Sequence, residues 1–482
     1  MGVLAEHEPK EVLRFFEEIC QIPHGSQNVG MISDYLVKFA KDRGLKYRQD
    51  EMKNVIIWKG GTKGYEQSAP VIIQGHMDMV AVKEDDCEKD LATEGLDLTI
   101  LDGDLISAVG TSLGGDDGIA VAYALALLDS DSIPHPPLEV VVTVDEEIGM
   151  LGADFLDTSD LQGHMLLNID SEDEGIFTVS CAGGASAICS LPYETEEKSG
   201  SLMRIKLTGL MGGHSGVEIN RGRLNSNRVM GRLLYALKDH DLTLVSISGG
   251  EKDNVISKVS EAVLLAAPAE ADAVKTVLQE KIEEIKAEYS TVEPGIQLDM
   301  QAEAAENIRC FTKASTKNLT RVLMNFPNGI QRMNPDMDDM VQTSLNIGIL
   351  TTEADKVVLT AALRSSSDTE KKFLTERVEA FMEMAGGSVE LMGNYPGWEY
   401  RPNSRLRDTM IAVYKAQYGQ APIVEGIHAG LECGLFASKI KDLDCISVGP
   451  QMHDIHSTSE VLSIASTRRT WILIKNTLAK LK

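Results

Sequence analysis

Histidine and carboxylate side chains gather in four short stretches of the sequence, and each stretch contains or follows an apolar run. These stretches are VIIQGHMDMV, VVVTVDEEIG, LLNIDSEDEG and CISVGPQMHDIHS, and a fifth, GTSLGGDDGIA, opens an apolar helix. The apolar runs are predicted strands, and ligands of α/β sheets bind at the carboxyl ends of the strands. We therefore expect these polar side chains to meet at one edge of a sheet.

His76 and Asp78 are two residues apart, so an extended backbone places both side chains on the same side. A metal-binding imidazole usually donates its other N–H to a carboxylate, and Asp78 is spaced for that role. A strand-end histidine that pairs with a local aspartate would give the same pattern. The pair alone therefore does not define a site.

Two pairs of adjacent carboxylates occur in these stretches. Asp116 and Asp117 lie in a glycine-rich turn before an apolar helix, where an N-cap role is the simpler interpretation. Glu146 and Glu147 directly follow a predicted buried strand. Adjacent buried carboxylates repel each other unless cations balance them, although a solvated loop would also accommodate them.

Asp170 ends the strand MLLNID, where a turn aspartate is the simpler interpretation. His456 lies in HDIHS, and His453, three residues earlier, is the alternative candidate for the same role. Considered together, the two histidines and several carboxylates form a nitrogen and oxygen donor set that suits zinc, manganese or cobalt. A two-metal site needs a bridging carboxylate and a free base that activates water. The sequence supplies enough carboxylates for both roles.

Cysteine usage and charge limit the class of protein. The seven cysteines are an odd number without a CxxC pair, which favours reduced thiols in a cytoplasmic protein over disulfides or a thiolate zinc site. The 46 basic and 73 acidic residues give a net charge of −27, which disfavours nucleic acid and anionic membranes as partners. No apolar run approaches the roughly 20 residues that span a bilayer, and the acidic N-terminus is not a secretory signal.

The hydrophobic pattern predicts an α/β protein with a mainly parallel sheet flanked by helices. Helices are predicted over residues 9–22, 29–42 and 118–128, and strands over 54–59, 70–74, 138–144, 165–170 and 444–448.

The middle of the chain instead predicts an inserted α+β domain. Its predicted strands are 201–208, 242–248, 262–267, 296–301, 344–351 and 356–364, and its predicted helices are 225–238, 270–289 and 368–384. The predicted domains are therefore a catalytic domain in two parts, 1–182 and 386–482, and an inserted lid or dimerisation domain, 183–385.

The motifs resemble a known family. GHMDMV, GTSLGGDDGIA, TVDEEIGMLGA, NIDSEDEG with CAGG, MGGHSG, and HAGLECGLF followed by His456 and Ser457 are similar to the di-zinc aminopeptidase, carboxypeptidase and aminoacylase family. Within it they most resemble the aminoacyl-histidine dipeptidase branch, which includes carnosinase-like (beta-alanyl-histidine) dipeptidases. The resemblance covers essentially the whole chain in the same order.

The resemblance implies a residue for each role at a pair of zinc ions, for which cobalt or manganese can substitute. His76 and Asp170 would hold one zinc, Glu147 and His456 the other, and Asp116 would bridge them. It also implies that Asp78 orients His76, that Glu146 is the general base toward water, and that the peptide bond between Asp116 and Asp117 is cis.

Four further residues are predicted to bind substrate by the same resemblance. They are His214 for the developing oxyanion, Arg364 for a substrate carboxylate, and Asn254 and His428 for further contacts. From the residues alone, a turn role for His214 and Asn254 and a solvated strand end for Arg364 remain open.

Three functions are compatible with these motifs. The resemblance implies a metallo-dipeptidase that hydrolyses aminoacyl-histidine or other dipeptides, and an N-acyl amino acid deacylase on the same fold is the alternative. A non-catalytic metal-binding protein would not need Glu146 beside a complete ligand set. The resemblance further implies a homodimer through the inserted domain, in which His214 acts at the partner's site.

Overall fold

The computed structural model describes residues 2–482, which form two compact units. The first consists of residues 2–180, Tyr400–Gly426 and Leu431–Lys482, and the second of Cys181–Glu399 and Ile427–Gly430. The second unit extends past residue 385 because a strand at Ser388–Tyr395 pairs within its sheet.

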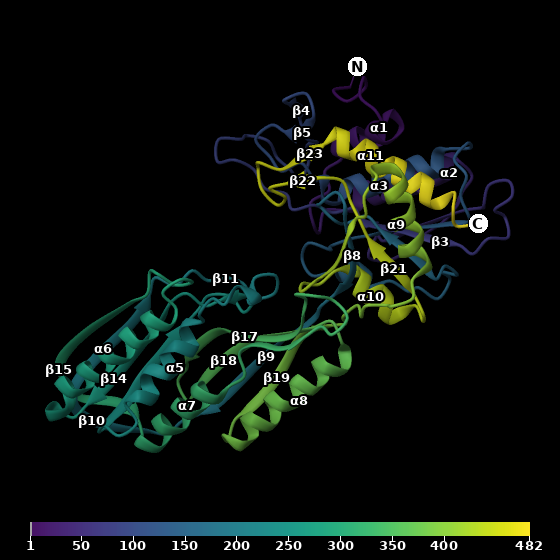
Figure 1. Ribbon diagram of the computed structural model, residues 1–482. Helices are drawn as coiled ribbons and strands as arrows, with labels where there is room; N and C mark the ends of the chain where they lie inside the picture. The colour runs from purple at the N-terminus through teal and green to yellow at the C-terminus, as the bar shows by residue number, and fades with distance from the viewer. Residues whose placement is uncertain (1) are drawn as a thin grey trace. The chain divides into compact units, whose positions relative to one another are not determined.

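The first unit is built on an eight-stranded sheet (Figure 1). Its central strands β6, β3, β7 and β21 are parallel, whereas β1 and β2 at one side and β8 at the other add antiparallel pairs. The prediction of an α/β fold is confirmed, with the parallel order confined to the centre. In spatial order the strands are β1 (Lys46–Gln49), β2 (Val55–Lys59), β6 (Leu138–Thr143), β3 (Val71–His76), β7 (Met165–Asn168), β21 (Asp444–Ser447), β8 (Ile176–Cys181) and β20 (Ile423–Ile427).

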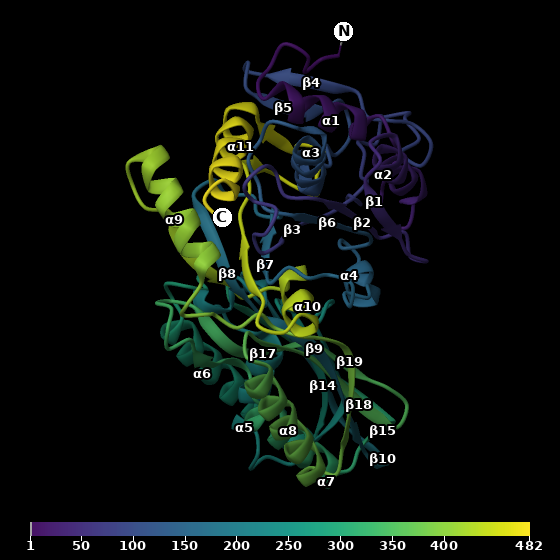
Figure 2. The same ribbon diagram turned by 90° about the vertical axis from the view of Figure 1, so that its right-hand side faces the viewer.

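Helix α3 (Gly115–Asp129) is the most buried helix of this unit. It is apolar on all sides and every residue from Gly115 to Leu128 is buried, as expected for a helix enclosed by other elements. It packs against β3 and α1 (Figure 2). Tyr123 of α3 stacks on Trp471 of α11. The other helices are α1 (Lys10–Cys20), α2 (Gly30–Asp42), α4 (Leu151–Phe155), α9 (Arg405–Tyr418), α10 (Glu432–Lys439) and α11 (Ile464–Leu478).

A small four-stranded sheet joins two distant parts of this unit. Its strands, in order, are β22 (Met452–His453), β23 (Val461–Ser463), β5 (Leu105–Ala108) and β4 (Leu98–Leu101). It therefore ties the segment before α3 to the segment that carries His456.

The second unit contains a nine-stranded sheet made of two similar halves. One half follows the order β10, α5, β12, β14, α6, β15 along the chain, and the other follows β9, α7, β17, β18, α8, β19. Each is a βαββαβ module, and the first is inserted between β9 and α7 of the second. The modules join edge to edge where β12 pairs with β17 through Ser248–Thr351 and Gly249–Leu350.

The helices of both modules cover one face of this sheet (Figure 1). The helices are α5 (Ser226–Ala236), α6 (Ala271–Glu288), α7 (Lys313–Asn325) and α8 (Asp368–Met384). The strands, in spatial order, are β15 (Gln297–Phe311), β10 (Thr195–Thr208), β14 (Ser260–Ala266), β12 (Leu242–Gly249), β17 (Val341–Thr352), β18 (Lys356–Ser365), β9 (Gly183–Pro192) and β19 (Ser388–Tyr395), and β16 (Gly329–Met333) pairs with β17.

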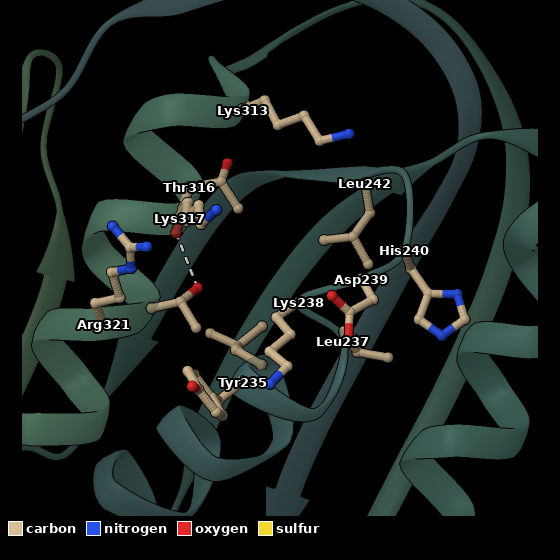
Figure 3. Close-up of a pocket in the computed structure, with 12 residues that line it drawn as sticks. Tyr235, Leu237, Lys238, Asp239, His240, Leu242, Lys313, Thr316, Lys317 and Arg321 are labelled. Atoms are coloured by element: carbon tan, nitrogen blue, oxygen red, sulfur yellow. Dashed lines mark hydrogen bonds between the residues drawn. The ribbon is translucent and has the colours of Figure 1, made fainter.

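A cavity of about 310 Å³ lies between the end of α5 and one face of α7 (Figure 3). Basic side chains line much of it, among them Lys313, Lys317 and Arg321 of α7. None of the predicted site residues lines this cavity, so it is separate from the chemistry that the motifs predict.

Candidate functional site

The predicted metal ligands come together in the first unit. His76 is the last residue of β3, Glu147 follows the end of β6, and Asp170 follows the end of β7. These three strands are neighbours in the sheet (Figure 2). Asp116 begins α3, and His456 follows β22. As the strand pattern predicted, the side chains meet at the carboxyl ends of parallel strands.

The ligand atoms form two groups that share Asp116. In the first, Nε2 of His76 lies 3.2 Å from Oδ1 of Asp116 and 3.6 Å from Oδ1 of Asp170. In the second, Nε2 of His456 lies 3.1 Å from Oδ2 of Asp116 and 3.0 Å from Oε2 of Glu147. Within each group the donor atoms lie within 4.8 Å of one another. One carboxylate therefore faces both histidines through its two oxygens.

The donor set fits divalent cations. Oε1 of Glu147 is buried without a hydrogen-bond partner among residues 2–482. The carboxylates of Asp116 and Glu147 raise the pKa of His456 to about 10, so a proton on this imidazole supplies the positive charge that the acids require. A metal ion would provide that charge instead, and imidazole with carboxylate is the donor set of zinc sites without thiolate ligands.

Asp78 contacts both His76 and the loop that carries the paired glutamates. Nδ1 of His76 lies 2.9 Å from the main-chain oxygen of Asp78 and 3.5 Å from its carboxylate. The carboxylate accepts hydrogen bonds from the backbone N–H of Glu146 at 3.1 Å and from Ser26 Oγ at 2.9 Å. The position of Asp78 suits the orienting role, and its closer link to His76 runs through the main chain.

Glu146 is partly buried beside the two groups of proposed ligands, and with His76 and Glu147 it forms a third possible cation-binding group. Burial raises the pKa of Glu146 to about 9, and the negative charges of Asp170, Glu432 and Glu147 act in the same direction. The positive charge of His76 lowers this pKa, but by less. A nearby cation would lower this pKa again because it favours the carboxylate form. The charge state of Glu146 thus depends on the cations that its neighbours hold.

The peptide bond between Asp116 and Asp117 is cis, as the resemblance implied. The N-cap of α3 is Gly114, not Asp116. Asp117 is buried, and its Oδ2 accepts a hydrogen bond from the backbone N–H of His76 at 3.1 Å. The two aspartates therefore face different partners, the histidine ligands for Asp116 and the end of β3 for Asp117.

Two further buried glutamates lie near the proposed ligands. Glu432 begins α10 and accepts hydrogen bonds from Gln74 Nε2 and from Thr143 Oγ1, at the ends of β3 and β6. Glu460 accepts backbone hydrogen bonds from the loop that leads into Asp116. Glu432 lies in the HAGLECGLF motif, whereas no local pattern marks Glu460.

His214, Arg364 and His428 lie close together in the second unit. His214 is in β11 (Gly213–His214), Arg364 is near the end of β18, and His428 is in the short return segment. A Cβ on Gly216 would lie 2.3 Å from the main-chain oxygen of His428, 2.9 Å from His214 Cε1 and 3.2 Å from Arg364 Nε. Gly216 therefore permits the close approach of all three.

The hydrogen bonds of His214 define its tautomer. Its Nδ1 accepts from the backbone N–H of Gly216 at 3.3 Å and of Val217 at 3.2 Å. Burial and the positive charge of Arg364 lower the pKa of His214. The ring is therefore neutral near pH 7, with its proton on Nε2, and can donate one hydrogen bond.

Arg364 is buried, with Nη1 3.3 Å from Tyr395 Oη and with Nε lacking a hydrogen-bond partner in the described chain. A buried guanidinium with unused donors suits an anionic ligand such as a carboxylate. Asn254 is exposed next to β13 (Val255–Ile256), and its main-chain oxygen accepts from Ser215 N–H at 2.9 Å. Nε2 of His428 lies 2.7 Å from Ser344 Oγ.

The fold and the sequence of the chain are those of a peptidase. The chain belongs to peptidase family M20/M25/M40, whose sequence profile matches residues 72–479, and it is a hydrolase of peptide bonds. No helix within residues 2–482 is both long and apolar enough to cross a membrane.

Individual relatives resemble the chain along its full length. The sequence is 34% identical to the cytosol non-specific dipeptidase of Escherichia coli, over 100% of this chain and 99% of that protein. The crystal structure of aminoacylhistidine dipeptidase from Vibrio alginolyticus superposes with a TM-score of 0.92 at 33% identity, covering 99% of this chain and 98% of that one. The aminopeptidase PepT of Bacillus cereus shares the fold, with a TM-score of 0.56 at 16% identity over 98% and 99% of the two chains.

Proposed function

We propose that the protein is a cytoplasmic dipeptidase that depends on two divalent cations, zinc in the first place, with cobalt or manganese as substitutes. The observation that carries the proposal is the pair of ligand groups that share Asp116. The full-length similarity to a cytosol non-specific dipeptidase and to an aminoacylhistidine dipeptidase supports dipeptides as substrates, and favours them over N-acyl amino acids.

Each ligand has a role in this proposal. His76 and Asp170 would hold one cation, Glu147 and His456 the other, and Asp116 would bridge them. Bound cations would polarise the scissile carbonyl group and acidify a water molecule. Glu146 would accept a proton from that water and later donate it to the leaving amine. Asp78 would orient His76 and fix the loop of Glu146.

The residues of the second unit would bind the substrate. Arg364 would pair with the free carboxylate of a dipeptide through its unused donors, and Nε2–H of His214 would donate to the oxygen on which negative charge develops. We assign Asn254 and His428 to further substrate contacts.

A substrate panel with the metal-reconstituted protein tests the proposal. We expect hydrolysis of unblocked dipeptides, including aminoacyl-histidine dipeptides, and a large loss of kcat/KM when the C-terminal carboxylate is amidated. The substitution Arg364→Met should remove most of the difference in kcat/KM between the free and the amidated dipeptide. Turnover of N-acetyl amino acids in place of dipeptides would instead identify a deacylase.

We also propose a homodimer through the second unit. Strand β15 is a 15-residue edge strand with mostly exposed side chains, and an unpaired strand edge can pair with a second copy. Sedimentation would reveal the dimer. Mixing Glu146→Gln chains with His214→Ala chains tests whether His214 acts at the partner's site, because restored activity in mixed dimers requires action between subunits.

A further inference from the structure

The carboxylate of Glu460 accepts four consecutive backbone N–H groups. Oε2 lies 2.9 Å from the nitrogen of Leu113 and 3.1 Å from that of Gly114. Oε1 lies 2.8 Å from the nitrogen of Gly115 and 3.3 Å from that of Asp116. Glu460 is only 2% exposed. One buried side chain therefore satisfies four successive backbone donors, from Leu113 to Asp116.

This carboxylate connects two proposed ligands that are far apart in the sequence. Asp116 supplies one of the four N–H donors, and Glu460 follows His456 by four residues. Two hydrogen bonds close the turns around His456 and before Glu460. Ser457 Oγ donates to the main-chain oxygen of Asp454, and the N–H of Glu460 donates to the main-chain oxygen of Ser457. Any displacement of Glu460 would therefore change the position of Asp116 relative to His456.

Glu460 itself is held by the four-stranded sheet. Its main-chain oxygen accepts a hydrogen bond from Ser107 Oγ at 3.0 Å, and Leu462 pairs with Ile106 two residues later. Glu460 thus lies immediately before β23 and is anchored to the four-stranded sheet, which makes it a suitable fixed support for the loop.

The loop sequence fits this contact. Gly114 adopts φ +67, which favours glycine, and a Cβ there would lie 2.7 Å from Met79 Sδ. A Cβ on Gly115 would lie 3.3 Å from Oε1 of Glu460 and 3.2 Å from Met452 Sδ. The two glycines allow the backbone to bring its N–H groups to the carboxylate.

We propose that Glu460 is a positioning residue of the metal centre. It holds Asp116 in place relative to His456, so that both side chains can bind the same divalent cation. The inference rests on the proposed function, since it assigns a support to the ligand that the two cations would share. Glu460 would touch neither the cations nor the substrate.

The arrangement requires a carboxylate of this length. Glutamine offers one acceptor oxygen, and its amide group would direct N–H donors at the N–H groups of the loop. Aspartate is one methylene shorter and cannot reach all four donors from the same backbone position. Loss of partners for supporting residues of metal sites typically weakens metal affinity by about 10- to 100-fold.

The test compares Glu460→Gln and Glu460→Asp with the wild-type protein. Zn²⁺ affinity is measured by competition with a chromophoric chelator, and the ligand geometry is followed through the visible absorption of bound Co²⁺. We expect Zn²⁺ affinity to fall about 10- to 100-fold in Glu460→Gln. The Co²⁺ spectrum should change, and kcat should recover in part at saturating metal.

Glu139 provides a matched control in the same unit. It is buried and accepts backbone N–H groups of Gln162 and Gly163, at 2.8 to 3.1 Å, near the amino end of β6. We expect Glu139→Gln to lower stability toward denaturant as Glu460→Gln does, but to keep wild-type Zn²⁺ affinity within about twofold. An equal loss of affinity in both variants would mean general destabilisation and would overturn the proposal.

Hydrogen exchange of the wild-type protein gives a test without a substitution. The amides of residues 113–116 should be protected before metal is added, because Glu460 already binds them. Rapid exchange there, or wild-type Zn²⁺ affinity in Glu460→Gln, would refute the positioning role. A wild-type protein that neither binds Zn²⁺ nor hydrolyses dipeptides would instead refute the proposed function.

Discussion

Glu146 and Glu147 are neighbours in the sequence but have different surroundings. Oε2 of Glu147 lies 3.0 Å from His456 Nε2, whereas no ligand histidine lies at hydrogen-bond distance from the carboxylate of Glu146 in the described chain. Their backbone N–H groups both point to the carboxylate of Asp78. This difference is compatible with the roles that the resemblance implies, Glu146 as the base and Glu147 as a ligand.

The first prediction separates these roles. Glu146→Gln should keep both cations and reduce kcat by about 10²- to 10⁴-fold, because the amide cannot accept the proton. Metal content and turnover of one dipeptide are measured on the same sample. Asp116→Ala serves as the contrasting variant, since it should lose metal. Near-wild-type kcat in Glu146→Gln would show that another group is the base.

The second prediction concerns protons that compete with the cations. Hydrogen bonds that His456 Nε2–H donates to the carboxylates of Asp116 and Glu147 raise the pKa of His456 to about 10, so below that pH its Nε2 must lose a proton before it binds metal. Apparent Zn²⁺ affinity should therefore rise with pH between about 6 and 8, by roughly tenfold per unit for each displaced proton. Chelator competition at several pH values measures the slope. A flat profile would exclude His456 as a ligand.

Among the elements of the second unit, the loop after β11 carries His214, which we propose contacts the substrate. Gly216→Ala would place a Cβ 2.3 Å from the main-chain oxygen of His428, so the loop must shift and carry His214 with it. We expect KM to rise by at least about tenfold while Zn²⁺ affinity stays unchanged. Gly222→Ala is a suitable control because its Cβ would meet no atom within 4 Å, although its φ of +72 costs some stability. Equal kinetics in the two variants would contradict the substrate role of this loop.

The strands that carry the ligands were predictable from the sequence because they are short, apolar and buried on both faces. Strand 138–144 corresponds to β6, and strand 165–170 to β7 with its following turn. Strand β9 and helix α7 were not predicted. Strand β9 contains mostly small residues, and α7 is polar overall with Thr316 and Thr320 among its buried residues, so both segments are less apolar than the predicted strands that carry the proposed ligands.

The backbone contacts around the proposed ligands could not be predicted from the sequence. Glu460 bonds to backbone groups 344 to 347 residues away, and such contacts leave no local pattern because every residue type except proline presents the same N–H. The orientation of His76 is a similar case, since its closer acceptor is the main-chain oxygen of Asp78. Residue spacing suggests which side chains share a face, but not which backbone atoms they meet.

For the whole molecule, the proposed cations balance part of a net charge of −27. Buried carboxylates around Asp116 repel one another without a counter-charge, so bound Zn²⁺ should stabilise the folded state. Binding at about 100 times the dissociation constant contributes roughly 2.7 kcal/mol. We expect Tm to fall on treatment with EDTA and to recover with Zn²⁺, and to be insensitive to both in Asp116→Ala. A Tm unaffected by EDTA in a protein shown to have lost its metal would contradict this coupling.

The junction between β12 and β17 has a consequence for how the substrate residues are assembled. His214 belongs to the module that starts with β10, and Arg364 belongs to the module that starts with β9, yet both lie against Gly216. Because one polypeptide contains both modules, their meeting is an intramolecular event with an effective concentration that dilution does not change. The pair can therefore form at any protein concentration, whatever the oligomeric state. The inserted module also cannot diffuse away from its counterpart, since the chain enters it from β9 and leaves it to α7.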